Sequence, residues 1–104
     1  MNYAVPYINT KGEQALFYVD YVIRMKNGQI FLFDTKSHGS DENAPNKHNA
    51  LYDYMNSTDN ASLGLKGGVL IYEYGNWKYS PLPISNTDDL TGWECFYPDQ
   101  YGND

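Results

Sequence analysis

Two apolar segments joined by a short turn constrain the fold of this chain more than any other feature of its sequence. Residues 16–25 and 29–35 are rich in Phe, Tyr, Val and Ile, a composition that favours strands with largely buried side chains. Residues 26–28 between them read Lys-Asn-Gly, and glycine accepts the positive φ that a tight hairpin turn requires. The pattern predicts a β-hairpin. Each segment nevertheless contains a carboxylate, Asp20 or Asp34, where an aliphatic side chain would stabilise a strand better.

The length of the turn decides whether these carboxylates share a face of the hairpin. Asp34 and Lys36 lie on the same side of their strand because side chains alternate between faces. With a two-residue loop, Asp20 would point to the face opposite Asp34. With a three-residue loop over 26–28, in which Gly28 is the left-handed residue, Asp20 lies directly across from Asp34. The Lys-Asn-Gly sequence favours the second register.

Facing carboxylates indicate a specific chemistry. Two carboxylates opposite each other in a sheet repel unless a cation lies between them. Mg²⁺ is bound by one or two carboxylates together with waters and phosphate oxygens, and a neighbouring lysine stabilises developing negative charge or orients a nucleophilic water. Asp20, Asp34 and Lys36 therefore predict a site for metal-assisted phosphodiester hydrolysis. Asp-x-Lys is also common on exposed strand faces, so the spacing alone leaves a solvated charged pair as an alternative.

The rest of the chain predicts one helix and further strands. The polar residues 37–46 form a loop in which Asp41 or Asn43 caps the following helix, and Pro45 suits its first turn. The continuous apolar run near residues 69–72 favours an interior strand with a parallel neighbour. We expect a loop over 1–14, a helix over 47–55, strands over 65–74 and 77–82, and an irregular tail over 85–104 anchored by Trp93 and Phe96.

This order of elements predicts a mixed sheet in an α/β or α+β domain, with a hairpin followed by a helical crossover into a buried strand. A chain of 104 residues has room for a single core, so we expect one domain over 1–104.

The single cysteine, Cys95, allows no internal disulfide and favours a reducing cytoplasm. Neither a signal peptide nor an apolar run of about 18 residues is present, so no transmembrane helix is expected.

The charge balance argues against an autonomous nucleic-acid binder. The chain has 13 acidic and 7 basic residues and a formal net charge of −6. Proteins that bind nucleic acid alone commonly present a basic face, because neutralising phosphates supplies most of the non-specific affinity. A metal ion, a partner or another domain would have to bring this chain to a polyanion.

The hairpin sequence is similar to a known family of nucleases. Leu-Phe-Tyr-x-Asp-Tyr-Val-Ile, a Lys-Asn-Gly turn and Ile-Phe-Leu-Phe-Asp-Thr-Lys together resemble the PD-(D/E)XK nuclease domain, and most of all the carboxy-terminal endonuclease domain of type III restriction enzymes and related helicase-nuclease proteins. The resemblance covers about residues 13–80, including Asn-Lys-His-Asn-Ala-Leu-Tyr at 46–52. It implies a restriction-endonuclease-like fold, Mg²⁺ dependence with Mn²⁺ as a substitute, and DNA cleavage.

The resemblance also assigns roles to residues. It makes Asp20 and Asp34 metal ligands, adds the carbonyl of Thr35 as a further ligand, and makes Lys36 the catalytic lysine. It implies that the chain is a module of a larger restriction or helicase-nuclease protein, with DNA, an ATP-dependent motor domain and a modification subunit as partners. The alternative is a catalytically silent module that keeps the fold for docking.

The sequence departs from the family pattern at three places. Val19 replaces the proline of the motif and Ser37 replaces a common glycine, but neither position supplies a ligand. The amino-terminal helix that often contributes a glutamate is missing, so Glu13 is at most a weak substitute and is more simply a loop carboxylate.

Two residues of the expected helix could serve the site. Lys47 either contacts phosphate or is an exposed first-turn residue, and His48 is expected to be solvated rather than a metal ligand, because no second His or Cys lies at zinc spacing.

Overall fold

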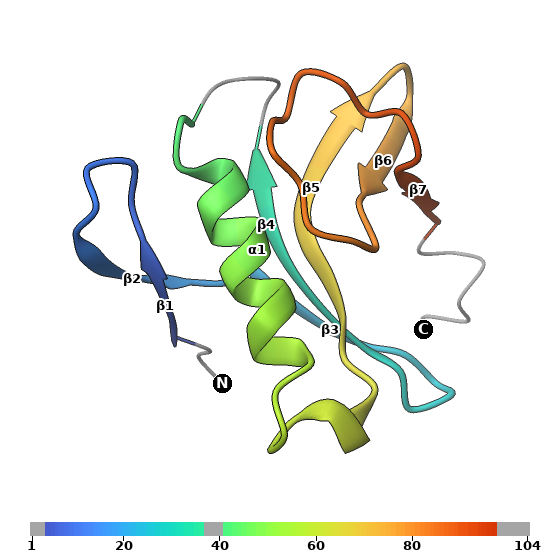
Figure 1. Ribbon diagram of the computed structural model, residues 1–104. Helices are drawn as coiled ribbons and strands as arrows, with labels where there is room; N and C mark the ends of the chain where they lie inside the picture. Colours follow the sequence, from blue (N-terminus) through green and yellow to red (C-terminus); the bar gives the residue numbers. More distant parts are fainter. Residues whose placement is uncertain (1–3, 37–40, 98–104) are drawn as a thin grey trace.

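The chain folds into an α+β structure with two sheets. The computed structural model describes residues 4–36 and 41–97, and over these the chain forms one α-helix, one 3₁₀ helix and seven strands (Figure 1). β1 and β2 form an antiparallel ribbon, and the five-stranded mixed sheet has the order β3-β4-β5-β6-β7, in which only β4 and β5 are parallel. The elements are β1 (Ala4–Ile8), β2 (Gln14–Tyr18), β3 (Tyr21–Arg24), β4 (Ile30–Lys36), α1 (Ala44–Met55), η1 (Ala61–Leu63), β5 (Lys66–Glu73), β6 (Asn76–Tyr79) and β7 (Glu94–Phe96).

The hairpin of β3 and β4 has the register that a three-residue loop predicts. The Met25 N–H donates to the Gln29 carbonyl at 2.8 Å, and the Gly28 N–H donates to the Met25 carbonyl at 3.0 Å. Gly28 has a φ of 91°, a conformation that a residue with a side chain adopts only with strain. Tyr21 is paired with Phe33, so the position before Tyr21 lies beside the position after Phe33. The predicted register is confirmed.

The prediction of one continuous strand over 16–25 is wrong. The chain leaves the ribbon after β2 and enters the larger sheet at β3, with Val19 and Asp20 between them. The Oδ2 atom of Asp20 accepts hydrogen bonds from the Thr35 backbone N–H at 3.1 Å and the Thr35 hydroxyl at 3.2 Å. A side chain thus replaces a backbone partner at the point where the chain changes sheets.

Two further strands were missed by the sequence analysis. The expected loop over 1–14 contains β1, in which Val5 is paired with Phe17 of β2. The expected irregular tail contains β7, where Cys95 is paired with Lys78 of β6. Phe96 is buried, as expected of an anchor. Trp93 is half-buried and packs against the cluster of Ala44, Val69, Ile71 and Leu90, also as expected.

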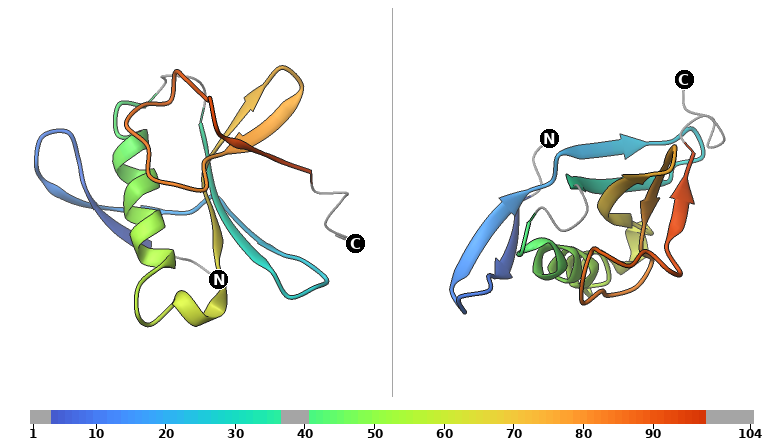
Figure 2. Two further views of the ribbon diagram at one scale, coloured as in Figure 1. Left: turned by 45° about the vertical axis from the view of Figure 1, so that its right-hand side comes forward. Right: turned by 90° about the horizontal axis from the view of Figure 1, so that it is seen from above.

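The two faces of the sheet have different coverings. Helix α1 and the segment 80–93 lie on one face, side by side, as the view from above in Figure 2 shows. Alternation along β4 places Leu32 on this face, where it packs with the helix residues Leu51 and Met55. On the opposite face the core is largely aromatic and consists of Met25, Phe31, Phe33, Leu70, Tyr79 and Phe96. Since Asp34 and Lys36 share the parity of Leu32, both lie on the helix-covered face.

Helix α1 begins at Ala44, three residues earlier than predicted, and Pro45 lies in its first turn as expected. Asn43 occupies the N-cap position, but its side-chain oxygen accepts the Thr10 N–H at 2.9 Å instead of capping the helix. The Asp41 carbonyl accepts the Ala44 N–H at 3.0 Å. The turn of the β1–β2 ribbon is thereby joined to the start of α1.

The expectation of a solvated His48 is wrong. The side chain is 1% exposed; its Nδ1 accepts the Val69 N–H at 3.0 Å, and its Nε2 lies 2.9 Å from the Leu82 carbonyl, to which it donates. These roles require the neutral ring. Burial lowers the pKa of His48 below its usual value, although the Leu82 carbonyl opposes that shift. His48 therefore joins α1, β5 and the segment after β6 as a structural residue.

Candidate active site

Asp34 lies near the carboxyl end of β4, beside the parallel strand β5. Its side chain is buried at 4% exposure, and its Oδ2 atom has no hydrogen-bond partner among the residues that the structure describes. The Lys36 Nζ atom lies 3.3 Å from this oxygen as an ion pair. A buried carboxylate oxygen normally has hydrogen-bond partners, so this one calls for an explanation.

Asp20 brings a second carboxylate to Asp34. Asp20 is exposed, and its hydrogen bonds with Thr35 fix it beside the end of β4. Burial raises the pKa of Asp34 to about 6; contact with the Asp20 carboxyl group and its negative charge act in the same direction, and Lys36 opposes them. The structure thus brings together the two aspartates and the lysine that the sequence predicted, from the β2–β3 junction and from β4.

Lys36 is held between two carboxylates. Its Nζ atom lies 3.3 Å from Asp34 Oδ2 and 3.5 Å from Asp41 Oδ2. Burial by itself would lower the pKa of Lys36, but the neighbouring carboxylates of Asp34 and Asp41 raise it above its usual value. Lys36 is therefore a cation at neutral pH, which suits it to stabilising negative charge and not to accepting a proton.

Asp41 and Lys47 extend this charged group toward α1. Lys47 Nζ lies 3.0 Å from Asp41 Oδ2 and is partly buried. Of the two alternatives for Lys47, the structure therefore excludes an exposed first-turn residue. The sequence analysis considered Asp41 only as a helix cap and missed its pairing with both lysines. The sequence did contain a signal for this pairing, because the acidic Asp41 lies in the loop between Lys36 at the end of one strand and Lys47 in the following helix.

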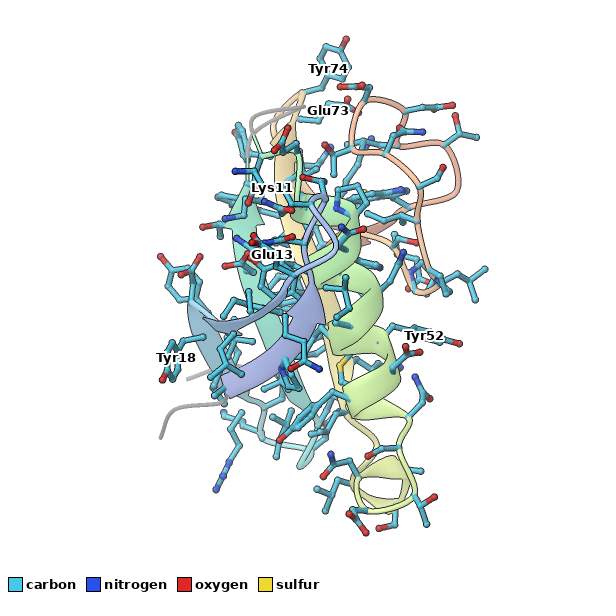
Figure 3. The ribbon with its side chains drawn as sticks, turned by 60° about the vertical axis from the view of Figure 1, so that its left-hand side comes forward. Lys11, Glu13, Tyr18, Tyr52, Glu73 and Tyr74 are labelled. Atoms are coloured by element: carbon cyan, nitrogen blue, oxygen red, sulfur yellow. The ribbon has the colours of Figure 1, made fainter. Side chains whose placement is uncertain are left out.

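Glu13 does not join this group in the described part of the chain. Figure 3 shows Glu13 beside Lys11 at the turn of the β1–β2 ribbon. Its carboxylate accepts a hydrogen bond from the Asn9 side chain at 3.3 Å. The simpler interpretation, a loop carboxylate, fits this contact. Ser37 lies outside the described residues.

Comparison with protein-family models, curated proteins and solved structures gives no match to this chain. The site must therefore be judged from its geometry. Over residues 4–36 and 41–97, no group of three or more His, Cys, Asp and Glu side chains is placed to hold a metal ion. The candidate ligand set consists of two carboxylates and main-chain oxygen. Within the same ranges, no helix has the length and apolar character needed to span a bilayer.

Replacing Asp34 with Asn should stabilise the metal-free chain. An acid whose pKa rises from 3.8 to about 6 on folding destabilises the folded state when it is ionised. The penalty is absent below pH 3.8, grows between pH 4 and 6, and is complete above about pH 6, where it amounts to about 3 kcal/mol. The free energy of unfolding of Asp34→Asn should exceed that of the wild type by about 2 kcal/mol at pH 7.5, since Lys36 also loses a charged partner.

Urea denaturation in EDTA from pH 4 to pH 8 measures this difference. The gain should shrink toward zero at pH 4. Asp59→Asn, which alters an exposed acid in the turn after α1, serves as the control and should shift stability by less than about 0.5 kcal/mol. Equal stability of Asp34→Asn and wild type at pH 7.5 would contradict the conclusion that the ionised, buried Asp34 carboxylate destabilises the folded state.

Proposed function

We propose that this chain is a Mg²⁺-dependent DNA endonuclease domain that hydrolyses phosphodiester bonds with Asp20, Asp34 and Lys36. The observation that carries the proposal is the buried Asp34 Oδ2 atom, which faces a second carboxylate and a lysine without a hydrogen-bond partner in the described part of the chain. Packing and solubility gain nothing from such an arrangement, whereas a divalent cation would relieve the repulsion.

The residues present fit a divalent cation of the Mg²⁺ type. Mg²⁺ keeps several waters and takes only one or two protein carboxylates, so the lack of a third acidic side chain in the described residues does not exclude it. Asp20 and Asp34 would hold the ion, with the Thr35 carbonyl as a further oxygen ligand. When bound, the ion would supply Lewis-acid activation of a phosphodiester and of a water nucleophile.

The side chains of the site would divide the remaining work. Asp20 is fixed by two hydrogen bonds from Thr35, which reduces the reorganisation needed when a ligand binds. Lys36 is protonated and lies 3.3 Å from Asp34, so its charge would stabilise a phosphate oxygen beside Asp34 that becomes more negative during hydrolysis. Its ammonium group also suits the orientation of a nucleophilic water.

The topology around the site supports the finer assignment to a restriction-endonuclease-like fold. The β3–β4 hairpin, the α1 crossover and the parallel strand β5 follow one another as the resemblance implies. The β1–β2 ribbon stands before the hairpin, where the family often has a helix. On this assignment the domain is a cytoplasmic module of a larger restriction or helicase-nuclease assembly, with an ATP-dependent motor and a modification subunit as partners.

A catalytically silent docking module is the second candidate. The lack of a third metal-binding side chain in the described ranges favours it, as does the ion pair that already compensates part of the charge on Asp34. The two candidates differ in their response to divalent ions. A silent module would show neither cleavage nor stabilisation by Mg²⁺ or Mn²⁺.

Isolated from partners, the chain should bind DNA weakly. Its net charge is −6, and three of its lysines, Lys36, Lys47 and Lys78, pair with carboxylates, so counterion release contributes little. Titration of a labelled duplex at about physiological salt should give a dissociation constant weaker than about 10 μM. Submicromolar, strongly salt-dependent binding would reveal a basic face that contradicts this account.

Cleavage of supercoiled plasmid at low salt tests the proposed function directly. Slow conversion to nicked or linear DNA should occur with Mg²⁺ or Mn²⁺ and stop with EDTA. In parallel, either ion should raise the midpoint of thermal unfolding of the wild type, because it binds the folded site only. No cleavage together with no stabilisation by either ion would overturn the proposal in favour of the silent module.

A further inference from the structure

Lys36 and Lys47 converge on a single oxygen atom from two different elements. Lys36 ends β4 and Lys47 lies in the first turns of α1, yet their Nζ atoms lie 3.5 Å and 3.0 Å from the same Asp41 Oδ2 atom. Both lysine side chains are largely buried, with 20% and 17% exposure. The two ammonium groups are therefore close enough to bind one anion together, and in this structure Asp34 and Asp41 balance their charge.

Lys47 has contacts that do not depend on Asp41. Its ammonium group lies 5.7 Å from the centre of the Tyr7 ring and 6.0 Å from that of Phe17, distances at which aromatic faces attract a cation. Lys36 likewise keeps Asp34 as a second partner. Both ammonium groups would therefore stay in place if the Asp41 carboxylate moved away.

The Asp41 carboxylate resembles a ligand that is part of the chain. Its Oδ2 atom binds both lysines, and its Oδ1 atom accepts the Asn43 N–H at 2.8 Å. Burial opposes the ionisation of Asp41, but Lys47, the Asn43 N–H and Lys36 together lower its pKa below the usual value. The carboxylate also lies at the amino end of the 12-residue helix α1, where the helix dipole favours an anion.

We propose that Lys36 and Lys47 form a binding site for a phosphate group of a nucleic-acid backbone, and that the Asp41 carboxylate occupies it until a substrate displaces it. Two ammonium groups from separate elements suit a phosphate, which offers each lysine an oxygen of its own, whereas Asp41 presents the same oxygen to both. Because Lys36 also contacts Asp34, this phosphate would lie next to the proposed metal-binding carboxylates. The role of this site in binding substrate rests on the proposed function, whereas its ability to bind an anion does not.

Removing the internal carboxylate should strengthen anion binding. We expect Asp41→Asn to bind inorganic phosphate, and separately a short DNA duplex, about tenfold more tightly than Asp59→Asn, which makes the same charge change at an exposed position in the turn after α1. The double variant Asp41→Asn/Lys47→Gln should lose the gain. Binding is measured in EDTA at constant ionic strength, so neither a divalent ion nor cleavage is required.

A second measurement uses the unaltered chain. Saturating phosphate should shift the backbone amide NMR signals of residues 34–36, 41–44 and 46–47 more than those of β6 and β7. An Asp41→Asn variant that binds phosphate no more tightly than Asp59→Asn, or shifts spread evenly over the wild type, would overturn the inference. A gain for free phosphate without one for duplex would overturn the nucleic-acid assignment.

The two proposals can fail separately. Plasmid cleavage with no phosphate effect would refute this inference alone, and a phosphate effect without plasmid cleavage would refute only the proposed nuclease.

Discussion

Asp34→Asn and Lys36→Ala should each reduce the rate of DNA cleavage by about 10³-fold or more while the fold remains intact. The first variant removes the buried carboxylate that faces Asp20, and the second removes the only cation in ion-pair contact with Asp34 among the described residues. Loss of one preorganised charged group at a reacting phosphate typically costs 10²–10³-fold, and loss of a metal ligand adds to this. Rates are measured by plasmid nicking in the most active preparation, whether the chain alone or the proposed assembly.

Matched controls separate this effect from a general change of charge. Asp59→Asn alters an exposed acid beyond α1, and Lys66→Ala alters an exposed lysine at the other end of the sheet. Both should cleave within about threefold of the wild type, since surface substitutions have small effects. Circular dichroism of all four variants verifies the fold. A Lys36→Ala protein with full activity would exclude the role assigned to Lys36.

Gly67→Ala should destabilise the fold more than any surface substitution. Gly67 lies opposite Leu32 in the parallel pair β4–β5 and has a φ of 138°. A Cβ atom there would lie 1.9 Å from the Leu32 carbonyl oxygen and 2.8 Å from its carbonyl carbon. The backbone of β4, an interior strand, cannot give way cheaply, so strain and overlap together should cost about 3–5 kcal/mol. This is a large part of the stability of a small domain.

Urea denaturation gives this cost, and Gly64→Ala provides the comparison. Gly64 also has a positive φ, 63°, but a Cβ atom at this position meets no atom within 4 Å. Its substitution should cost only about 1 kcal/mol, the price of the backbone conformation alone. If the two variants were equally stable, close packing of β5 against β4 would not be the source of the Gly67 effect.

Local sequence chemistry was sufficient to predict the hairpin register, whereas the roles of the three candidate site residues stay a prediction. The Lys-Asn-Gly turn determines a register through the positive φ of Gly28, and alternation then places Asp34 and Lys36 on one face of β4, while hydrogen bonds from Thr35 hold Asp20 at the end of that strand. The apolar run of β5 likewise predicts its interior position, with a parallel neighbour on one side. These features depend on residues close to one another in the chain.

The missed features depend on contacts between distant residues. The break between β2 and β3 follows from the Asp20–Thr35 hydrogen bonds, which composition does not reveal in an apolar run. β1 was missed because the mixed composition of residues 1–14 and their Thr-Lys-Gly-Glu segment indicate a loop, whereas β1 forms by pairing with β2 ten residues further along. His48 was misjudged because its partners, Val69 and Leu82, come from segments far along the chain.

The most direct test of the metal site is a crystal of the wild-type chain soaked in Mn²⁺ and measured near the manganese absorption edge. The account predicts an anomalous difference peak between the carboxylates of Asp20 and Asp34, within about 2.5 Å of an oxygen from each. The same soak of Asp34→Asn crystals should leave that position without a peak. Well-ordered carboxylates with no anomalous density between them, at a Mn²⁺ concentration that labels other acidic groups, would contradict the central claim.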